Sequence, residues 1–154
     1  MPMPATGSRI HLFLLPPLPP SSSNNRPIQG KAHMKYRCAI VDDEPLALDL
    51  LESYIRKTAG LELVIKTDDL QKAEQLVEDK RVDLIFLDIN IRGVERENIT
   101  RLIQKDCYFI IVTAYPLSFI EDIRLNTEHG YLSKPASFTL FLNEVQRVTK
   151  ERQR

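Results

Sequence analysis

Hydrophobic residues in this chain gather in short runs that alternate with segments of helical periodicity. Most of the runs are apolar throughout, not only at every second position, which is typical of strands buried on both faces. The five strands predicted from these runs are Tyr36–Val41, Leu61–Lys66, Val82–Leu87, Tyr108–Val112 and Gly130–Ser133.

The segments between and after the runs carry apolar residues every three or four positions, the spacing that places them on one face of a helix. The five predicted helices are Pro45 to about Thr58, Leu70–Lys80, Glu95–Lys105, Leu117–Asn126 and Phe138–Val148. Strands that alternate with helices form a parallel sheet with helices on both of its faces. The pattern therefore predicts one doubly wound α/β domain with a five-stranded parallel sheet over residues 35–150, and a polar tail at 151–154.

The first 34 residues differ in composition from the rest. They hold seven of the ten prolines and the polar run Ser21–Asn25, and proline blocks both helices and central strands. We expect a disordered or polyproline-like arm over residues 1–34. Two interpretations stay open, a non-native leader with Met34 as the natural start and a genuine proline-rich docking arm. A secretion signal is disfavoured, because the apolar run Ile10–Leu15 is short and is interrupted by His11.

Charge is distributed unevenly along the chain. The 21 basic and 21 acidic side chains cancel, but the first 34 residues hold three basic and no acidic ones, so the predicted domain is mildly acidic. With no basic stripe or recognition helix after Lys150, we expect no direct binding of nucleic acid. No stretch approaches the ~18 consecutive apolar residues of a membrane span. Cys38 and Cys107 lie in apolar runs, as small buried residues of a reducing compartment do, so we expect a cytoplasmic protein.

Polar residues follow four of the predicted strands directly. The first strand ends in Asp42-Asp43-Glu44 and the third in Asp88. The fourth ends in Thr113, which offers a hydroxyl donor, and the fifth in Lys134, a point charge suited to a carboxylate or a phosphoryl oxygen. The carboxyl ends of parallel strands meet at one edge of the sheet, where ligands bind in open α/β folds. We therefore expect these groups to converge in one site.

Clustered carboxylates repel one another unless a positive charge neutralises them. A magnesium ion suits such a cluster, since it prefers oxygen ligands, keeps several waters and is usually held by one or two carboxylates together with phosphate oxygens. We expect Asp43 and Asp88 to bind Mg²⁺ directly and Asp42 to act through a water. The backbone carbonyl of Asn90 can complete the coordination shell.

Four short motifs, each at its own strand end, carry a resemblance to a known family. They are Val41–Pro45, Asp83–Ile89, Thr113–Tyr115 and Tyr131–Pro135. In this order they resemble the receiver domain of bacterial two-component response regulators over about 115 residues, which implies a flavodoxin-like (CheY-like) (βα)5 fold. The residues around the third and fourth motifs look most similar to receivers of the LytTR (LytR/AlgR) group.

The resemblance implies a role for each residue at the strand ends. Asp88 matches the phosphoacceptor, and Thr113 and Lys134 match the residues that contact the phosphoryl group. The positions that match the family's Mg²⁺ site are Asp42, Asp43, Asp88 and the backbone carbonyl of Asn90. Mg²⁺ is thus the implied cofactor.

Tyr131, three residues before the matched lysine, corresponds to the family's switch aromatic. The resemblance implies that Thr113 turns toward the phosphoryl group and that Tyr131 fills the vacated space. This change would alter the surface formed by Leu117–Asn126, Gly130–Ser133 and Phe138–Val148, through which a homodimer can form.

The implied function is that of a phosphoacceptor in a phosphorelay, not of a metabolic enzyme. The phosphoryl group would come from a sensor histidine kinase or a phosphotransfer protein, and the domain would catalyse only its own phosphorylation and dephosphorylation. We expect the usual DNA-binding output domain of the LytTR group to be absent, and no membrane partner.

The sequence departs from the family after Asp88. Receivers commonly carry a Met-Pro pair there, whereas this chain has Ile91-Arg92, so we expect a differently shaped loop in which Arg92 can contact the phosphoryl group. The departure leaves an alternative open, a phosphorylation-independent pseudo-receiver that acts as a protein-interaction module. A phosphatase of the haloacid-dehalogenase kind is disfavoured, because Asn90 stands where that family has a second aspartate.

Overall fold

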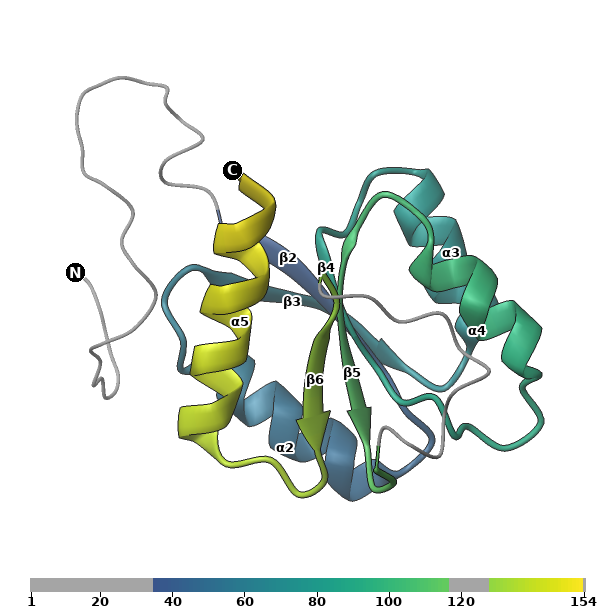
Figure 1. Ribbon diagram of the computed structural model, residues 1–154, viewed down its shortest axis with the longest axis horizontal. Coiled ribbons are helices and arrows are strands. Elements are labelled where there is room, and N and C mark those ends of the chain that lie inside the picture. The colour runs from purple at the N-terminus through teal and green to yellow at the C-terminus, as the bar shows by residue number, and fades with distance from the viewer. Residues whose placement is uncertain (1–34, 117–127, 154) are drawn as a thin grey trace.

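A computed structural model describes residues 35–116 and 128–153, which form one sheet with helices on both sides (Figure 1). The strands are β2 (Tyr36–Val41), β3 (Leu61–Thr67), β4 (Leu84–Leu87), β5 (Tyr108–Thr113) and β6 (Gly130–Ser133). Neighbouring strands pair in parallel throughout, in the order β3-β2-β4-β5-β6. The predicted five-stranded parallel sheet of a doubly wound α/β domain is confirmed.

Four helices lie between and after the strands within the described ranges. They are α2 (Pro45–Arg56), α3 (Leu70–Glu78), α4 (Arg96–Ile103) and α5 (Phe138–Gln153). Each occupies the position of a predicted helix. The helix predicted at Leu117–Asn126 and the arm predicted at 1–34 lie outside the described residues.

The bounds of all four described helices differ by one to five residues from the predicted ones, because the hydrophobic pattern does not encode helix ends. Helix α3 ends at Glu78, and Lys80 then takes a φ of 58°, a left-handed conformation that does not continue a helix. Helix α5 continues past Val148 to Gln153. Its last turn is polar and therefore carries no apolar periodicity.

Successive residues of the central strands face opposite sides of the sheet. In β4, Leu84 and Phe86 pack with residues of α2 and α5, whereas Ile85 and Leu87 pack with residues of α3 and α4. All four side chains are fully buried. The sheet is thus held between two helical layers, and the ends of its strands are fixed at one edge.

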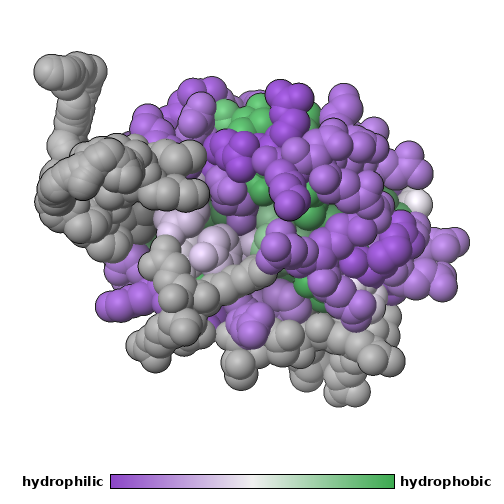
Figure 2. All heavy atoms as spheres, turned by 90° about the horizontal axis from the view of Figure 1, so that it is seen from above, coloured by the Kyte–Doolittle hydropathy of each residue, from purple (hydrophilic) through white to green (hydrophobic). Residues whose placement is uncertain are grey.

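The face of the molecule drawn in Figure 2 is predominantly polar. Figure 2 shows a face on which hydrophilic side chains dominate and hydrophobic ones appear only in small areas between them. Large hydrophobic residues that are exposed within the described ranges are Leu46, Val64, Tyr115 and Leu140. In this part of the chain no helix combines the length and the apolar character that crossing a bilayer requires.

Candidate functional site

Four side chains from four strand ends meet at the carboxyl edge of the sheet. Asp42 follows β2, Asp88 follows β4, Thr113 is the last residue of β5, and Lys134 follows β6. Backbone hydrogen bonds continue the parallel pairing into the site, since the Asp88 N–H donates to the Val41 carbonyl at 2.9 Å and the Lys134 N–H to the Thr113 carbonyl at 2.8 Å. The same ladder that forms the sheet therefore positions the side chains that follow it.

The acidic residues form a tight cluster. Asp42, Asp43 and Asp88 each present a carboxylate oxygen, and these three atoms lie within 4.8 Å of one another. Asp42 and Asp88 are only 1% and 4% exposed. Burial raises the pKa of Asp88 to about 6, and the neighbouring charge of Asp42 adds to the effect. A buried cluster of this kind favours the binding of a cation.

Lys134 provides a positive charge beside this cluster. Its Nζ lies 2.6 Å from Glu44 Oε1, 2.9 Å from Asp42 Oδ2 and 3.4 Å from Asp88 Oδ2. Burial alone would lower the pKa of Lys134, but the hydrogen bond to Glu44 and the close ion pair with Asp42 outweigh it and hold the pKa above its ordinary value. One charged ammonium thus faces three carboxylates and neutralises the buried pair only in part. Sequence reasoning placed Glu44 at this edge of the sheet but did not identify its contact with Lys134.

One oxygen of Asp42 indicates how the remaining charge can be balanced. Oδ1 accepts a hydrogen bond from the Glu44 N–H at 2.9 Å, whereas the buried Oδ2, although close to Lys134, has no hydrogen-bond partner among the residues that the structure describes. A buried carboxylate oxygen that accepts no hydrogen bond and shares its ammonium with two other carboxylates suits a cation or a water bound to one. Because the donor atoms of the cluster are all carboxylate oxygens, the residues present fit a hard divalent cation such as Mg²⁺.

Arg92 contacts the acidic cluster at Asp43. Its backbone N–H and its Nε donate to Asp43 Oδ2 at 3.2 and 3.0 Å. The Arg92 N–H first, and then its guanidinium, hold the pKa of Asp43 below its ordinary value. The Arg92 side chain is 87% exposed. Arg92, which the sequence suggested as a contact of a phosphoryl group, lies here on an expected metal ligand.

Asn90 joins the site through its side chain as well as its backbone. Its N–H donates to Asp88 Oδ1 at 2.9 Å, and its Nδ2 donates to Thr113 Oγ1 at 3.0 Å. Its Oδ1 accepts from Arg96 Nη2 at 3.1 Å. The sequence pointed only to the Asn90 carbonyl and did not identify Arg96, because no periodic pattern runs through the segment from residue 88 to 95 that brings the two together.

Tyr131 lies half-buried on β6 and packs against the apolar cluster that faces α3 and α4. Its hydroxyl donates to the Tyr115 carbonyl at 2.9 Å. The Tyr115 N–H in turn donates to Thr113 Oγ1 at 3.1 Å. The backbone of Tyr115 therefore connects the expected switch aromatic with the buried hydroxyl of the site.

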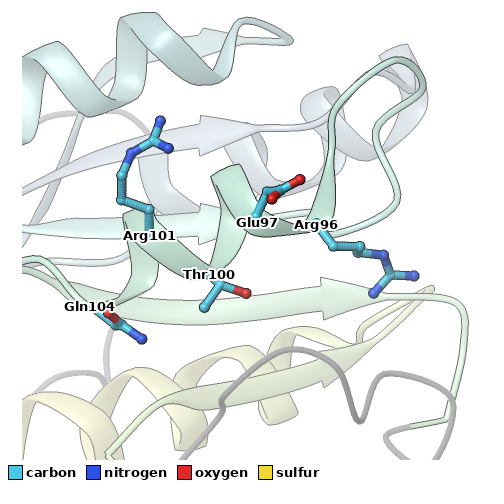
Figure 3. A pocket seen from close by; sticks show the side chains of 5 residues that line it. All are labelled: Arg96, Glu97, Thr100, Arg101 and Gln104. Atoms are coloured by element: carbon cyan, nitrogen blue, oxygen red, sulfur yellow. The ribbon is translucent and has the colours of Figure 1, made fainter.

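A groove of about 530 Å³ lies along α4 and is lined by Arg96, Glu97, Thr100, Arg101 and Gln104 (Figure 3). None of these residues comes from a strand end. Figure 3 shows Arg96 at the end of α4 that lies nearest the carboxyl ends of the strands, with its side chain extended in that direction. Its hydrogen bond to Asn90 links this end of the groove to the site.

Comparison with known proteins agrees with this geometry. A family model described as response regulator receiver domain matches residues 38–146. The chain is 28% identical over 116 residues to the sensory transduction protein LytT of Enterococcus faecalis, with 73% of this chain and 47% of that protein covered. It is 29% identical over 119 residues to protein MrkE of Klebsiella pneumoniae, with 75% and 44% covered.

A solved structure supports the same fold. The crystal structure of the response regulatory domain of MrkE from Klebsiella pneumoniae is 29% identical and gives a TM-score of 0.60, with 77% of this chain and 99% of that chain covered. The chain spans slightly less than half the length of the two curated relatives. The likeness therefore concerns the part of those proteins that this chain covers.

Proposed function

Since this chain belongs to the response regulator receiver domain family, we propose that it accepts a phosphoryl group on Asp88 from a sensor histidine kinase or a phosphotransfer protein. The observation that carries the proposal is the buried Asp88 carboxylate, which has two further carboxylates within 4.8 Å and Lys134 Nζ at 3.4 Å. A carboxylate is a usable nucleophile for phosphoryl transfer when positive charge screens it from the phosphoryl oxygens.

The proposed step is a displacement at phosphorus. An oxygen of Asp88 attacks and forms a P–O bond, while the P–N bond to the donor histidine breaks and leaves its electron pair on the imidazole nitrogen. In dephosphorylation, water attacks the phosphorus, the P–O bond to the aspartyl oxygen breaks, and inorganic phosphate leaves. We assign the domain no reaction beyond its own phosphorylation and dephosphorylation.

Residues of the chain hold the reacting groups in place. Asp43 and Asp88 would bind Mg²⁺ directly, with Asp42 through a water and the Asn90 carbonyl as a further ligand. When bound, Mg²⁺ neutralises charge on the phosphoryl oxygens. Lys134, kept charged and in place by Glu44 and Asp42, can pair with the same oxygens.

The output is proposed to pass through Thr113 and Tyr131. Thr113 would turn toward the phosphoryl group and Tyr131 would fill the space, and the Tyr115 backbone between them supports such coupling. The affected surface would comprise Gly130–Ser133 and Phe138–Val148 together with 117–126, and a homodimer would form through it. We propose that the domain acts in the cytoplasm, where kinase and receiver meet.

The Arg92–Asp43 contact favours a second candidate, a pseudo-receiver that binds a partner without phosphorylation. Arg92 occupies one oxygen of an expected metal ligand and stands where the family commonly has proline. In that case the site would be a structural remnant, and partner binding would not depend on Asp88.

Incubation with acetyl phosphate and Mg²⁺, followed by intact-protein mass spectrometry, tests the proposal. We expect the wild-type chain to gain one phosphoryl group and Asp88→Asn to gain none. Asp49→Asn, at an exposed position of α2, is the matched control and should behave as wild type. A wild-type chain that neither acetyl phosphate nor beryllofluoride modifies would exclude the phosphoacceptor function and favour the pseudo-receiver.

A further inference from the structure

A short chain of hydrogen bonds runs from α4 to the buried hydroxyl of the site. Arg96 Nη2 donates to Asn90 Oδ1 at 3.1 Å, and Asn90 Nδ2 donates to Thr113 Oγ1 at 3.0 Å. The Tyr115 N–H donates to the same oxygen at 3.1 Å. Thr113 is completely buried, so water does not compete for its hydroxyl.

The chemistry of the donors fixes the direction of this chain. A guanidinium group only donates, so the carbonyl end of the Asn90 amide must face Arg96 and its NH₂ end must face Thr113. A hydroxyl has two acceptor positions and one proton. In Thr113 both acceptor positions are taken, by Asn90 and by the Tyr115 N–H.

The Thr113 hydroxyl can therefore act toward any further group only as a donor. Within residues 35–116 and 128–153, the structure gives its proton no acceptor. A phosphoryl oxygen only accepts hydrogen bonds, and a bond from a donor to a charged acceptor is among the stronger ones. The vacant donor of Thr113 thus matches the group that the proposed function brings to Asp88.

We infer that Arg96 and Asn90 are positioning residues, which orient the Thr113 hydroxyl so that its proton is the group it offers to the anion held at Asp88 when Thr113 turns toward that anion. The inference rests on the proposed phosphoacceptor function. It also gives a reason for an amide at position 90, because a carboxylate there would accept from both Arg96 and Thr113 and would occupy the hydroxyl proton. Arg96 acts through Asn90 and needs no contact with the phosphoryl group.

A double-mutant cycle with beryllofluoride and Mg²⁺ tests the inference, with binding measured by ¹⁵N NMR titration. Thr113→Val keeps the shape and removes the hydroxyl, and we expect roughly 10-fold weaker binding. Arg96→Met leaves Asn90 free to rotate, and we expect about 3- to 10-fold weaker binding when Thr113 is present. In the Thr113→Val background, Arg96→Met should weaken binding no further. Arg96→Lys, which keeps a donor, should restore part of the affinity.

The cycle distinguishes the orienting role of Arg96 from the effect of its positive charge on the anion. The loss of a positive charge near an anion would weaken binding equally with and without the Thr113 hydroxyl, and that result would overturn the inference. Unchanged binding by Arg96→Met would overturn it as well. Arg101→Met is the control, because Arg101 lies on the same helix but pairs with Glu74.

A second measurement does not depend on beryllofluoride. In the free protein, the Asn90 side-chain amide protons should exchange slowly with solvent in the wild type and faster in Arg96→Met. Equal exchange rates would overturn the orienting role of Arg96, even if beryllofluoride binds. If the exchange rates differ as expected but the wild type binds no beryllofluoride, the proposed phosphoacceptor function is wrong. The claim that Thr113 donates to an anion at Asp88 is then wrong as well.

Discussion

The interior of the sheet and its carboxyl edge differ in how their buried groups are satisfied. In the interior, apolar side chains contact others of their kind, as where Phe86 of β4 stacks on Phe141 of α5 with ring centroids 5.2 Å apart. At the edge, the buried carboxylates of Asp42 and Asp88 share one ammonium, and Asp42 Oδ2 forms an ion pair with it but accepts no hydrogen bond among the described residues. The interior is complete by itself, whereas we propose that the edge is completed by a ligand.

This difference implies that the two regions contribute to stability with opposite sign. The burial of apolar surface favours folding, and the burial of neighbouring like charges opposes it. The packed interior therefore holds the edge in an arrangement that its own charges disfavour. Without metal, we expect substitutions in the interior to destabilise the domain and neutral substitutions at the edge to stabilise it.

The largest effect is expected in the interior. Phe86→Ala removes a fully buried ring from the cluster that faces α2 and α5, and we expect the free energy of unfolding to fall by about 3–5 kcal/mol. Urea denaturation followed by circular dichroism measures the change. Leu46→Ala, at a position that is 83% exposed, is the control and should stay within about 0.5 kcal/mol of wild type. Similar small losses for both variants would contradict the comparison.

At the edge of the sheet, we expect a substitution to raise the free energy of unfolding, the opposite of its effect in the interior. The pKa of Asp88, about 6 in the folded protein, lies above the ordinary value of about 4, and this difference corresponds to about 3 kcal/mol. We therefore expect Asp88→Asn to raise the free energy of unfolding by about 1–3 kcal/mol at pH 7 in the presence of EDTA. Asp49→Asn should leave it nearly unchanged. A destabilised Asp88→Asn would mean that Lys134 and Asn90 compensate fully for the buried charge.

The pH dependence of this effect identifies its cause. Because folding raises the pKa of Asp88, this group favours the folded state fully below about pH 4, and that contribution is lost as the pH rises through about 6. The stability gap between Asp88→Asn and the wild type should widen from about pH 4 to pH 7 and then stay constant. A gap that does not change with pH would point to packing as the cause.

Bound magnesium should reduce the difference between the stabilising interior and the destabilising edge. At ten times its dissociation constant, a ligand that binds only the folded state stabilises it by about 1.4 kcal/mol. We expect thermal denaturation to show this gain for the wild type and little of it for Asp88→Asn, which lacks one charged ligand. Potassium chloride at equal ionic strength is the control. An equal gain in both variants would place the ion elsewhere.

The smallest effect is expected at the rim of the edge. Arg92→Met removes the exposed guanidinium from Asp43 and leaves the backbone N–H in place. Exposed ion pairs contribute about 0.2–1 kcal/mol, so the affinity for Mg²⁺ should rise about 2- to 5-fold in an isothermal titration. Arg56→Met, which breaks an exposed pair with Glu52 on α2, should not change it. Weaker binding by Arg92→Met would instead mean that Arg92 supports the metal site.

Much of the fold and part of the site could be predicted from local patterns. The strand Ile85–Leu87 ends directly in Asp88, and because parallel strands end at one edge, such a residue must lie near the others that follow strands. The same logic applies to Asp42, Thr113 and Lys134. These residues are connected to regular backbone by a single peptide, so their positions depend little on loop conformation.

The contacts of Arg92 and Arg96 could not be predicted in this way. Both lie in or directly after the segment between β4 and α4, which has no periodic pattern and includes Gly93 with a φ of 81°. A small change in such a backbone redirects a long side chain by several ångströms. The sequence pattern therefore contains no information on which carboxylate or amide each guanidinium meets.

By itself, the sequence determined the order of strands and helices, the burial of both faces of the sheet and the set of polar residues at its edge, because each of these follows from hydrophobic periodicity and from the geometry of parallel strands. Only the tertiary structure decided how those polar residues are paired: Lys134 with Glu44 and Asp42, Arg92 with Asp43, and Asn90 between Arg96 and Thr113. Hydrogen bonds and ion pairs depend on distances of a few ångströms between segments far apart in the chain, and packing, not local pattern, sets those distances.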